Sequence, residues 1–89
     1  LFAAGYSSCF NSALEMVLKQ ANVTGKSTIT AIVSLYEKEP FDYVVGVELE
    51  GHIDGLEADK TEEMLKKAHE VCPYSKATRG NIEVTLKAV

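Results

Sequence analysis

The first part of the chain has the apolar spacing of a helix. In residues 1–21 the apolar side chains recur at intervals of three and four, which is the period of one buried helical face. They are Phe2, Tyr6, Cys9, Phe10, Ala13, Leu14, Val17 and Leu18. Small residues such as Gly5 leave room for another element or a ligand to approach the backbone near Cys9. Residues 22–27 contain Gly25 and are predicted to form the following loop.

The middle of the chain alternates with the period of β-strands. Apolar and polar residues alternate over residues 28–35, and a second alternating run covers residues 43–53, so each run predicts a strand. Residues 37–40, Glu-Lys-Glu-Pro, interrupt the pattern. We expect them to connect the two strands as a β-hairpin, where the missing N–H of Pro40 costs nothing. Residues 54–55, Asp-Gly, should close the second strand.

The final third predicts a second helix and a last strand. Asp59 and Glu62 have the spacing of a capping box, and an apolar stripe with helical period follows. The stripe consists of Met64, Leu65, Ala68, Val71 and Cys72. Pro73 should end this helix because a proline cannot continue it. Residues 73–80 are then expected to form a loop, and the alternation of residues 82–87 predicts a strand.

Length and charge limit the class of protein. With 89 residues, the order helix, hairpin, helix and strand predicts a single α+β domain, residues 1–89, whose small core should be supplemented by a partner. A net charge of −4 with nine scattered basic residues argues against a nucleic-acid partner. No apolar run approaches the roughly 20 residues of a membrane span, and the signal-peptide pattern is missing. We therefore expect a cytoplasmic protein without a membrane partner.

The two cysteines are the candidates for chemistry. Cys9 lies within Tyr-Ser-Ser-Cys-Phe and Cys72 within Val-Cys-Pro-Tyr-Ser. A domain without secretory features has no need of a single long-range disulfide, so these residues favour a reactive pair. The alternative is that both are small buried hydrophobic residues, which is the commoner state of a free cysteine. The pattern by itself leaves both interpretations open.

A pair of thiols is suited to peroxide chemistry. One thiolate attacks a peroxide oxygen and becomes a sulfenic acid, and a second thiol condenses with that acid to form a disulfide. Cys72 is expected at a helix C-terminus, where the negative end of the helix dipole disfavours a thiolate, so it suits the resolving role. Cys9 requires a cationic partner to be reactive, yet no basic residue lies within one helical turn of it.

Two segments resemble a known family. Residues 1–10, Leu-Phe-Ala-Ala-Gly-Tyr-Ser-Ser-Cys-Phe, and residues 71–82, Val-Cys-Pro-Tyr-Ser-Lys-Ala-Thr-Arg-Gly-Asn-Ile, closely resemble the two signature segments of the organic hydroperoxide resistance proteins. These proteins are a branch of the OsmC-like family. The resemblance extends over essentially the whole chain and corresponds to the C-terminal two-thirds of the family fold, without its N-terminal strands.

The resemblance implies a thiol peroxidase of the oxidative-stress response. Cys9 would be the peroxidatic residue and Cys72 the resolving residue, and the substrates would be organic and fatty-acid hydroperoxides. Family members are cytoplasmic, intertwined homodimers that are recycled by lipoyl-bearing proteins and use no metal, haem or flavin cofactor. Their activating arginine and glutamate belong to a segment before the position of Leu1. We therefore expect the natural chain to begin upstream, and the alternative is a non-catalytic, truncated OsmC-like domain that keeps the fold and dimer surface.

Further residues could serve the site or the core. Tyr6, Phe10 and Tyr74 are predicted to contact the substrate, with Phe2 and Met16 as further candidates for lining an acyl pocket. Aromatic residues and methionine at helical spacing are also common core residues, so the core remains the alternative for all of them.

The remaining polar candidates are expected to be structural. His69 could join Cys9 and Cys72 as a metal ligand, but no fourth ligand is evident, and we expect no metal and a partly exposed packing role for His69. His52 should be a surface partner across strands, and Arg79 should have a structural role in a turn. The charges of residues 62–67 have i,i+4 spacing and predict a solvated helix face.

Overall fold

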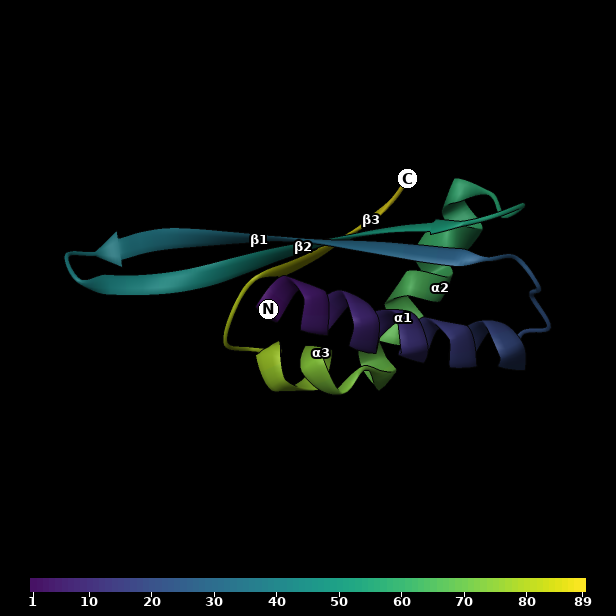
Figure 1. Ribbon diagram of the computed structural model, residues 1–89, viewed down its shortest axis with the longest axis horizontal. Coiled ribbons are helices and arrows are strands. Elements are labelled where there is room, and N and C mark those ends of the chain that lie inside the picture. The colour runs from purple at the N-terminus through teal and green to yellow at the C-terminus, as the bar shows by residue number, and fades with distance from the viewer.

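The computed structural model describes residues 1–89 as three helices and one sheet (Figure 1). The elements are α1 (Phe2–Gln20), β1 (Ser27–Glu39), β2 (Asp42–Ile53), α2 (Ala58–Val71), α3 (Pro73–Thr78) and β3 (Val84–Ala88). β1 and β2 form an antiparallel hairpin, and β3 joins the other edge of β2 in parallel. The predicted α+β class and the order helix, hairpin, helix, strand are confirmed, with one additional helix.

The hairpin is longer than the alternation predicted. β1 continues through Glu39, because Glu37 pairs with Tyr43 and Glu39 with Asp42, with one irregularity between the two pairs. The expected strand break at Glu37 was therefore wrong: these charged side chains are exposed, so they do not interrupt the backbone ladder. The turn itself consists of Pro40 and Phe41 and contains no ladder hydrogen bond that the proline would remove.

The core lies between one face of the sheet and the helices. Its thirteen residues come mainly from α1, β2 and α2. They are Tyr6, Phe10, Ala13, Leu14, Val17, Leu18, Val47, Leu49, Ile53, Met64, Leu65, Ala68 and Cys72. A Cβ atom at Gly51 would collide with the Leu65 side chain, so this glycine allows α2 to pack directly on β2. Burial of a leucine of this kind contributes about 1.5–3 kcal/mol.

The second half of the chain corrects three predictions. α2 begins at Ala58 with Glu57 as its N-cap and no side-chain cap hydrogen bond, so the capping box at Asp59 was wrong, because Asp59 already lies in the first turn. Residues 73–80 are not a loop, because Pro73 starts α3. Proline suits the first helical position, where its fixed φ is favourable and its missing N–H has no partner to lose. The last strand begins at Val84, two residues later than expected.

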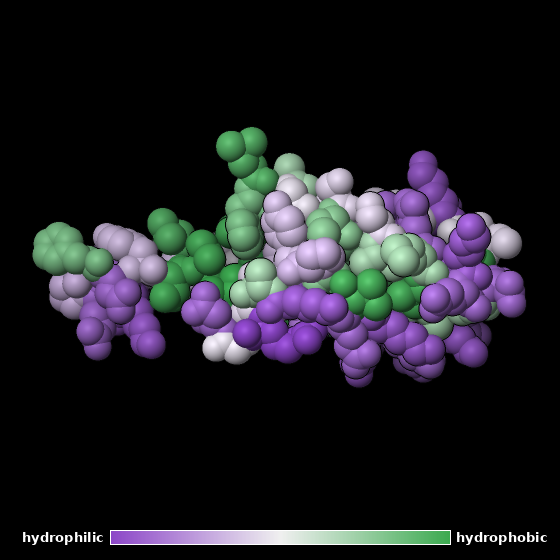
Figure 2. Space-filling view, turned by 90° about the horizontal axis from the view of Figure 1, so that it is seen from below, coloured by the Kyte–Doolittle hydropathy of each residue, from purple (hydrophilic) through white to green (hydrophobic).

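The exposed surface has two features that matter below. On α2, Lys66 pairs with Glu62 and Lys67 with Glu63 at i,i+4 spacing, as predicted. The hairpin extends past the helices in a molecule of 48 × 21 × 21 Å, and Figure 2 shows hydrophobic side chains among hydrophilic ones at this projecting end. We call its exposed apolar residues the hairpin tip. They are Leu35, Tyr36, Phe41, Tyr43 and Val44.

No helix of the structure is both long enough and apolar enough to cross a membrane.

Candidate active site

The fold brings the two cysteines together. Cys9 lies in the middle of α1 and is half-buried, whereas Cys72 lies between α2 and α3 and is fully buried. Although they are 63 positions apart in the chain, the Cys72 thiol donates to the Cys9 sulfur at 3.5 Å. A disulfide requires about 2.05 Å between sulfur atoms, so an approach of roughly 1.5 Å would close the bond. The two thiols therefore lie as close together as a reactive pair requires.

The environment of Cys72 differs from the one expected at a helix C-terminus. Cys72 ends α2 and is also the N-cap of α3. Burial raises the pKa of the Cys72 thiol, and the neighbouring Cys9 raises this pKa further. The backbone N–H groups of Ser75 and Tyr74, in the first turn of α3, lower this pKa and so act in the opposite direction. The helix-dipole argument considered only α2 and missed the N–H groups that α3 provides.

A hydrogen-bonded network of side chains lies beside the thiols. The Tyr6 hydroxyl is 2.8 Å from Ser75 Oγ and 3.3 Å from Thr78 Oγ1, and all three side chains are buried. Ser75 Oγ is also 2.7 Å from His69 Nδ1. Sequence reasoning missed Ser75 and Thr78 because it placed them in a loop. The available signal was Pro73, since proline is as typical of the first helical position as of a helix end.

His69 is fixed from two sides. Its Nδ1 contacts Ser75, and its backbone carbonyl accepts a hydrogen bond of 2.8 Å from Arg79 Nη2. Burial lowers the pKa of His69 from its ordinary value of 6.5, the charge of Arg79 lowers it further, and Glu70 raises it. The guanidinium of Arg79 is thus engaged in holding α3 to the end of α2.

The predicted substrate-binding residues have different surroundings. Tyr6 and Phe10 are completely buried, whereas Tyr74 is 38% exposed. Tyr6 and Tyr74 lie 5.6 Å apart between ring centroids, and Phe2 lies 5.9 Å from Tyr6 and 6.2 Å from Tyr74. A Cβ atom at Gly5 would come within 2.7 Å of the Tyr74 hydroxyl, so this glycine admits the ring onto α1. The aromatic cluster borders the thiols, and its role in substrate binding stays a prediction.

Other candidate sites lie elsewhere. One cavity of about 520 Å³ adjoins the C-terminal half of α1 and the loop after it, and another of about 290 Å³ lies over β1, β2 and β3. Neither cavity is lined by a cysteine.

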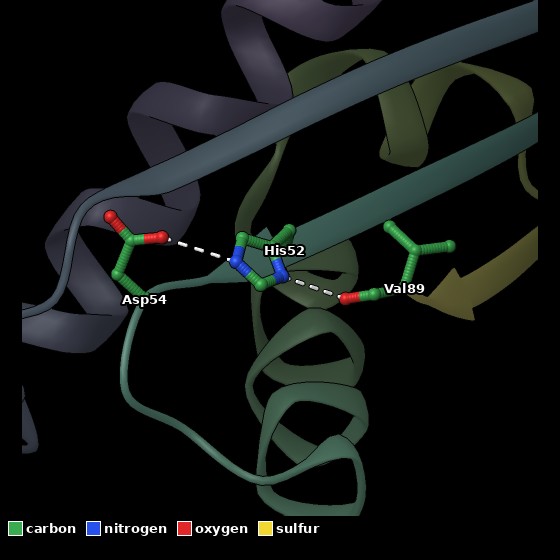
Figure 3. A network of polar contacts seen from close by, with 3 residues as sticks. All are labelled: His52, Asp54 and Val89. Carbon is green, nitrogen blue, oxygen red and sulfur yellow. Dashed lines mark hydrogen bonds and ion pairs between the residues drawn. The ribbon is translucent and has the colours of Figure 1, made fainter.

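No group of three or more His, Cys, Asp or Glu side chains could hold a metal ion. Figure 3 shows the His52 ring between Asp54 and Val89. Its Nε2 lies 3.1 Å from Asp54 Oδ1, and its Nδ1 lies 2.8 Å from the Val89 carbonyl oxygen. These contacts agree with a structural role for His52 at the surface.

Comparison with known proteins places this arrangement in a family. The model of the family described as OsmC-like protein matches residues 1–87. The chain belongs to the OsmC-like protein family. Within that family it is 50% identical over 88 residues to the organic hydroperoxide resistance protein OhrA of Bacillus subtilis, a match that covers 98% of this chain and 62% of OhrA. The similarity therefore lies in the organic hydroperoxide resistance branch.

Solved structures of the same branch share the fold. The crystal structure of the organic hydroperoxide resistance protein OhrB of Bacillus subtilis has a TM-score of 0.93 and 44% identity, and the match covers 100% of this chain and 67% of that one. The structure of an organic hydroperoxide resistance protein from Elizabethkingia anophelis has a TM-score of 0.91 and 47% identity over 99% of this chain and 64% of that one. The chain thus spans a little under two-thirds of the length of most of these relatives.

Proposed function

We propose that the protein containing this chain reduces organic hydroperoxides to alcohols through a disulfide cycle between Cys9 and Cys72. The observation that carries the proposal is the 3.5 Å contact between the two sulfur atoms in a chain whose relatives are named for organic hydroperoxide resistance. A peroxidatic and a resolving thiol must face each other to form a disulfide, and this contact therefore supports the cycle.

The cycle has three balanced steps. The thiolate of Cys9 attacks the terminal oxygen of the hydroperoxide, and the O–O bond breaks, so that Cys9 becomes a sulfenic acid. The alkoxide leaves and takes up a proton to become the alcohol. The sulfur of Cys72 then attacks the Cys9 sulfur, and the hydroxyl leaves as water. An external dithiol reduces the disulfide by thiol–disulfide exchange and is itself oxidised to a disulfide. We propose a lipoyl-bearing protein as this dithiol.

The surroundings of the thiols support an apolar substrate. Phe2, Tyr6 and Tyr74 form a continuous aromatic cluster along the N-terminal half of α1 and the start of α3. Tyr74 is the member of this cluster that a substrate could reach together with Phe2, since both are about 40% exposed. Tyr6 and Phe10 would shape the site from below, because they are completely buried.

Peroxide consumption by cysteine variants tests the cycle. We expect the protein to consume an alkyl hydroperoxide in the presence of a reduced lipoyl dithiol, and Cys9→Ser to abolish consumption. Cys72→Ser should permit one oxidation of Cys9 to the sulfenic acid but no intramolecular disulfide. A Cys9→Ser variant with unchanged peroxide consumption would overturn the proposal. An inactive protein whose two thiols survive an excess of peroxide would favour a non-catalytic OsmC-like domain.

We further propose that the protein is a homodimer. The hairpin tip places five large apolar side chains on one projecting ribbon (Figures 1 and 2), and a ribbon of this kind buries such side chains only against another surface. Light scattering should therefore give the mass of a dimer. Leu35→Glu should shift the mass toward the monomer, and the matched change Lys38→Glu at an exposed charged position should not. A monomeric parent protein would contradict this proposal.

A further inference from the structure

The two segments that carry the thiols are joined by a second contact besides the sulfur atoms. The Tyr6 hydroxyl lies 2.8 Å from Ser75 Oγ, and both side chains are completely buried. Tyr6 precedes Cys9 on α1 by about one helical turn, and Ser75 follows Cys72 in the first turn of α3. The hydroxyl pair and the thiol pair therefore link the same two segments. The disulfide cycle described above uses the thiols and makes no use of the hydroxyls.

The hydroxyls and the sulfur atoms belong to the same pieces of backbone. Tyr6 and Cys9 lie within one continuous helix. Cys72 is the N-cap of α3, and its carbonyl accepts a hydrogen bond of 3.0 Å from the Lys76 N–H, which closes the first turn around Ser75. Residues within one hydrogen-bonded turn keep a fixed separation. A fixed contact between Tyr6 and Ser75 therefore limits how far Cys72 moves from Cys9.

The Tyr6 hydroxyl makes the directional contacts between α1 and α3. All hydrogen bonds between these two helices come from it, at 2.8 Å to Ser75 Oγ and 3.3 Å to Thr78 Oγ1. The aromatic contacts of Tyr74 with Tyr6 and Phe2 also join the two helices. Apolar contacts are non-directional, so they hold the helices together without fixing how one is placed along the other.

α3 depends on such contacts for its position. It has only six residues, and its N-cap makes no side-chain hydrogen bond. Helices far longer than this are only marginally stable in isolation. Ser75 Oγ is also 2.7 Å from Nδ1 of His69 on α2, so the Ser75 side chain is held between α1 and α2. Tyr6 supplies the link to the helix that carries Cys9.

We propose that Tyr6 is a positioning residue for the Cys9–Cys72 disulfide. Through its contact with Ser75, the Tyr6 hydroxyl holds the Cys72 segment against α1 in the reduced protein, so that the two sulfur atoms stay close enough to react. The hydroxyl contact and the disulfide restrict the same motion, and each therefore stabilises the other. The inference deepens the resolving step of the proposed function, but its test requires only that the two thiols form a disulfide.

The equilibrium of the disulfide with a reference dithiol tests the proposal. The folded protein is equilibrated with mixtures of reduced and oxidised dithiothreitol, free thiols are trapped by alkylation, and mass spectrometry gives the oxidised fraction. Tyr6→Phe should make the disulfide about two- to fivefold less favourable, because the effect cannot exceed one net hydrogen bond. A fivefold change corresponds to about 20 mV. An unchanged equilibrium, or a disulfide that becomes more favourable, would overturn the proposal.

This measurement distinguishes positioning from a general role in stability. Both redox forms are folded during the exchange, as thermal melts of each variant establish, so a loss of overall stability that is equal in the two forms leaves the equilibrium unchanged. Ser75→Ala removes the other half of the contact and should also disfavour the disulfide. The double variant Tyr6→Phe/Ser75→Ala should lose no more than Tyr6→Phe alone, because both changes remove the same contact. Losses that multiply in the double variant would contradict a shared cause.

Ser27→Ala is the matched control. It also removes a single serine hydroxyl that ties α1 to a neighbouring element, since Ser27 Oγ at the start of β1 donates to Asn11 Oδ1 at 2.7 Å. This contact does not involve the Cys72 segment, so the disulfide equilibrium should stay at the parent value. A loss equal to that of Tyr6→Phe would mean that any loosening of α1 has the same effect, and it would overturn the specific role of Tyr6.

Treatment with peroxide separates this inference from the proposed function. With one equivalent of an alkyl hydroperoxide, the parent protein should form the Cys9–Cys72 disulfide, and Tyr6→Phe should form it more slowly. If the parent forms the disulfide with oxidised dithiothreitol but not with the hydroperoxide, the proposed function fails, while the exchange equilibrium still decides the role of Tyr6. A parent protein that forms no disulfide by exchange would overturn the inference itself.

Discussion

Closing the Cys9–Cys72 disulfide should stabilise the folded protein strongly. The bond joins positions 63 residues apart, so in the unfolded chain it closes a loop of most of the 89 residues. In the chain-entropy description, a loop of this length reduces the entropy of the unfolded state by an amount worth about 4 kcal/mol at room temperature. This is a large share of the about 5–15 kcal/mol that stabilises a typical domain.

The folded state should retain most of this gain. The sulfur atoms already lie 3.5 Å apart, so closing the bond requires only a small displacement of the two residues. Urea unfolding of the oxidised and reduced forms, followed by circular dichroism, measures the difference. With a slope of about 1–1.5 kcal/mol/M, a gain of about 4 kcal/mol moves the midpoint by roughly 3 M.

Two controls make this measurement decisive. The protomer concentration must be equal in both samples, because association shifts the apparent stability. Cys72→Ser given the same oxidising treatment should show no gain. An oxidised protein that is no more stable than the reduced one would refute the reasoning, because it would mean that the bond strains α3 by as much as it restricts the unfolded chain.

Two further predictions concern the polar network. Tyr6→Phe should lower the free energy of unfolding by about 1 kcal/mol, because it removes one buried hydroxyl whose neighbours Ser75 and Thr78 keep other partners. Tyr74→Phe removes a hydroxyl that makes no hydrogen bond, so in the same urea assay it should change the free energy of unfolding by no more than about 0.5 kcal/mol. Equal losses in the two variants would contradict the assignment of the hydrogen bonds to Tyr6. Burial and Arg79 hold the pKa of His69 below 6.5, so the unfolded chain binds a proton between pH 6.5 and the lower native value while the folded chain does not. Stability should therefore fall as the pH decreases through this window, and His69→Asn should lose that part of the pH dependence in urea titrations at neutral and mildly acidic pH.

Local patterns determined the main elements of the fold. The three-and-four spacing of α1, the alternation of β1 and β2 and the apolar stripe of α2 each reflect a face that must be buried, and such periodicity is visible in a single segment. The resemblance of residues 1–10 and 71–82 to the organic hydroperoxide resistance proteins added the expectation that Cys9 and Cys72 meet. Boundaries were less predictable. Pro73 was interpreted as the end of α2, although it also begins α3, because proline suits both positions.

Only the tertiary structure decided how distant residues share one environment. Neither the parallel pairing of β3 with β2 nor the contact of Gly51 with Leu65 leaves a periodic signal, because each depends on how separate elements pack. The same holds for the network around Ser75, whose hydroxyl lies 2.8 Å from that of Tyr6 near the other end of the chain. A sequence records which side chains are available. The burial of Cys72 and its contact with Cys9 follow from the packing of the helices against one another, and packing is a property of the folded chain as a whole.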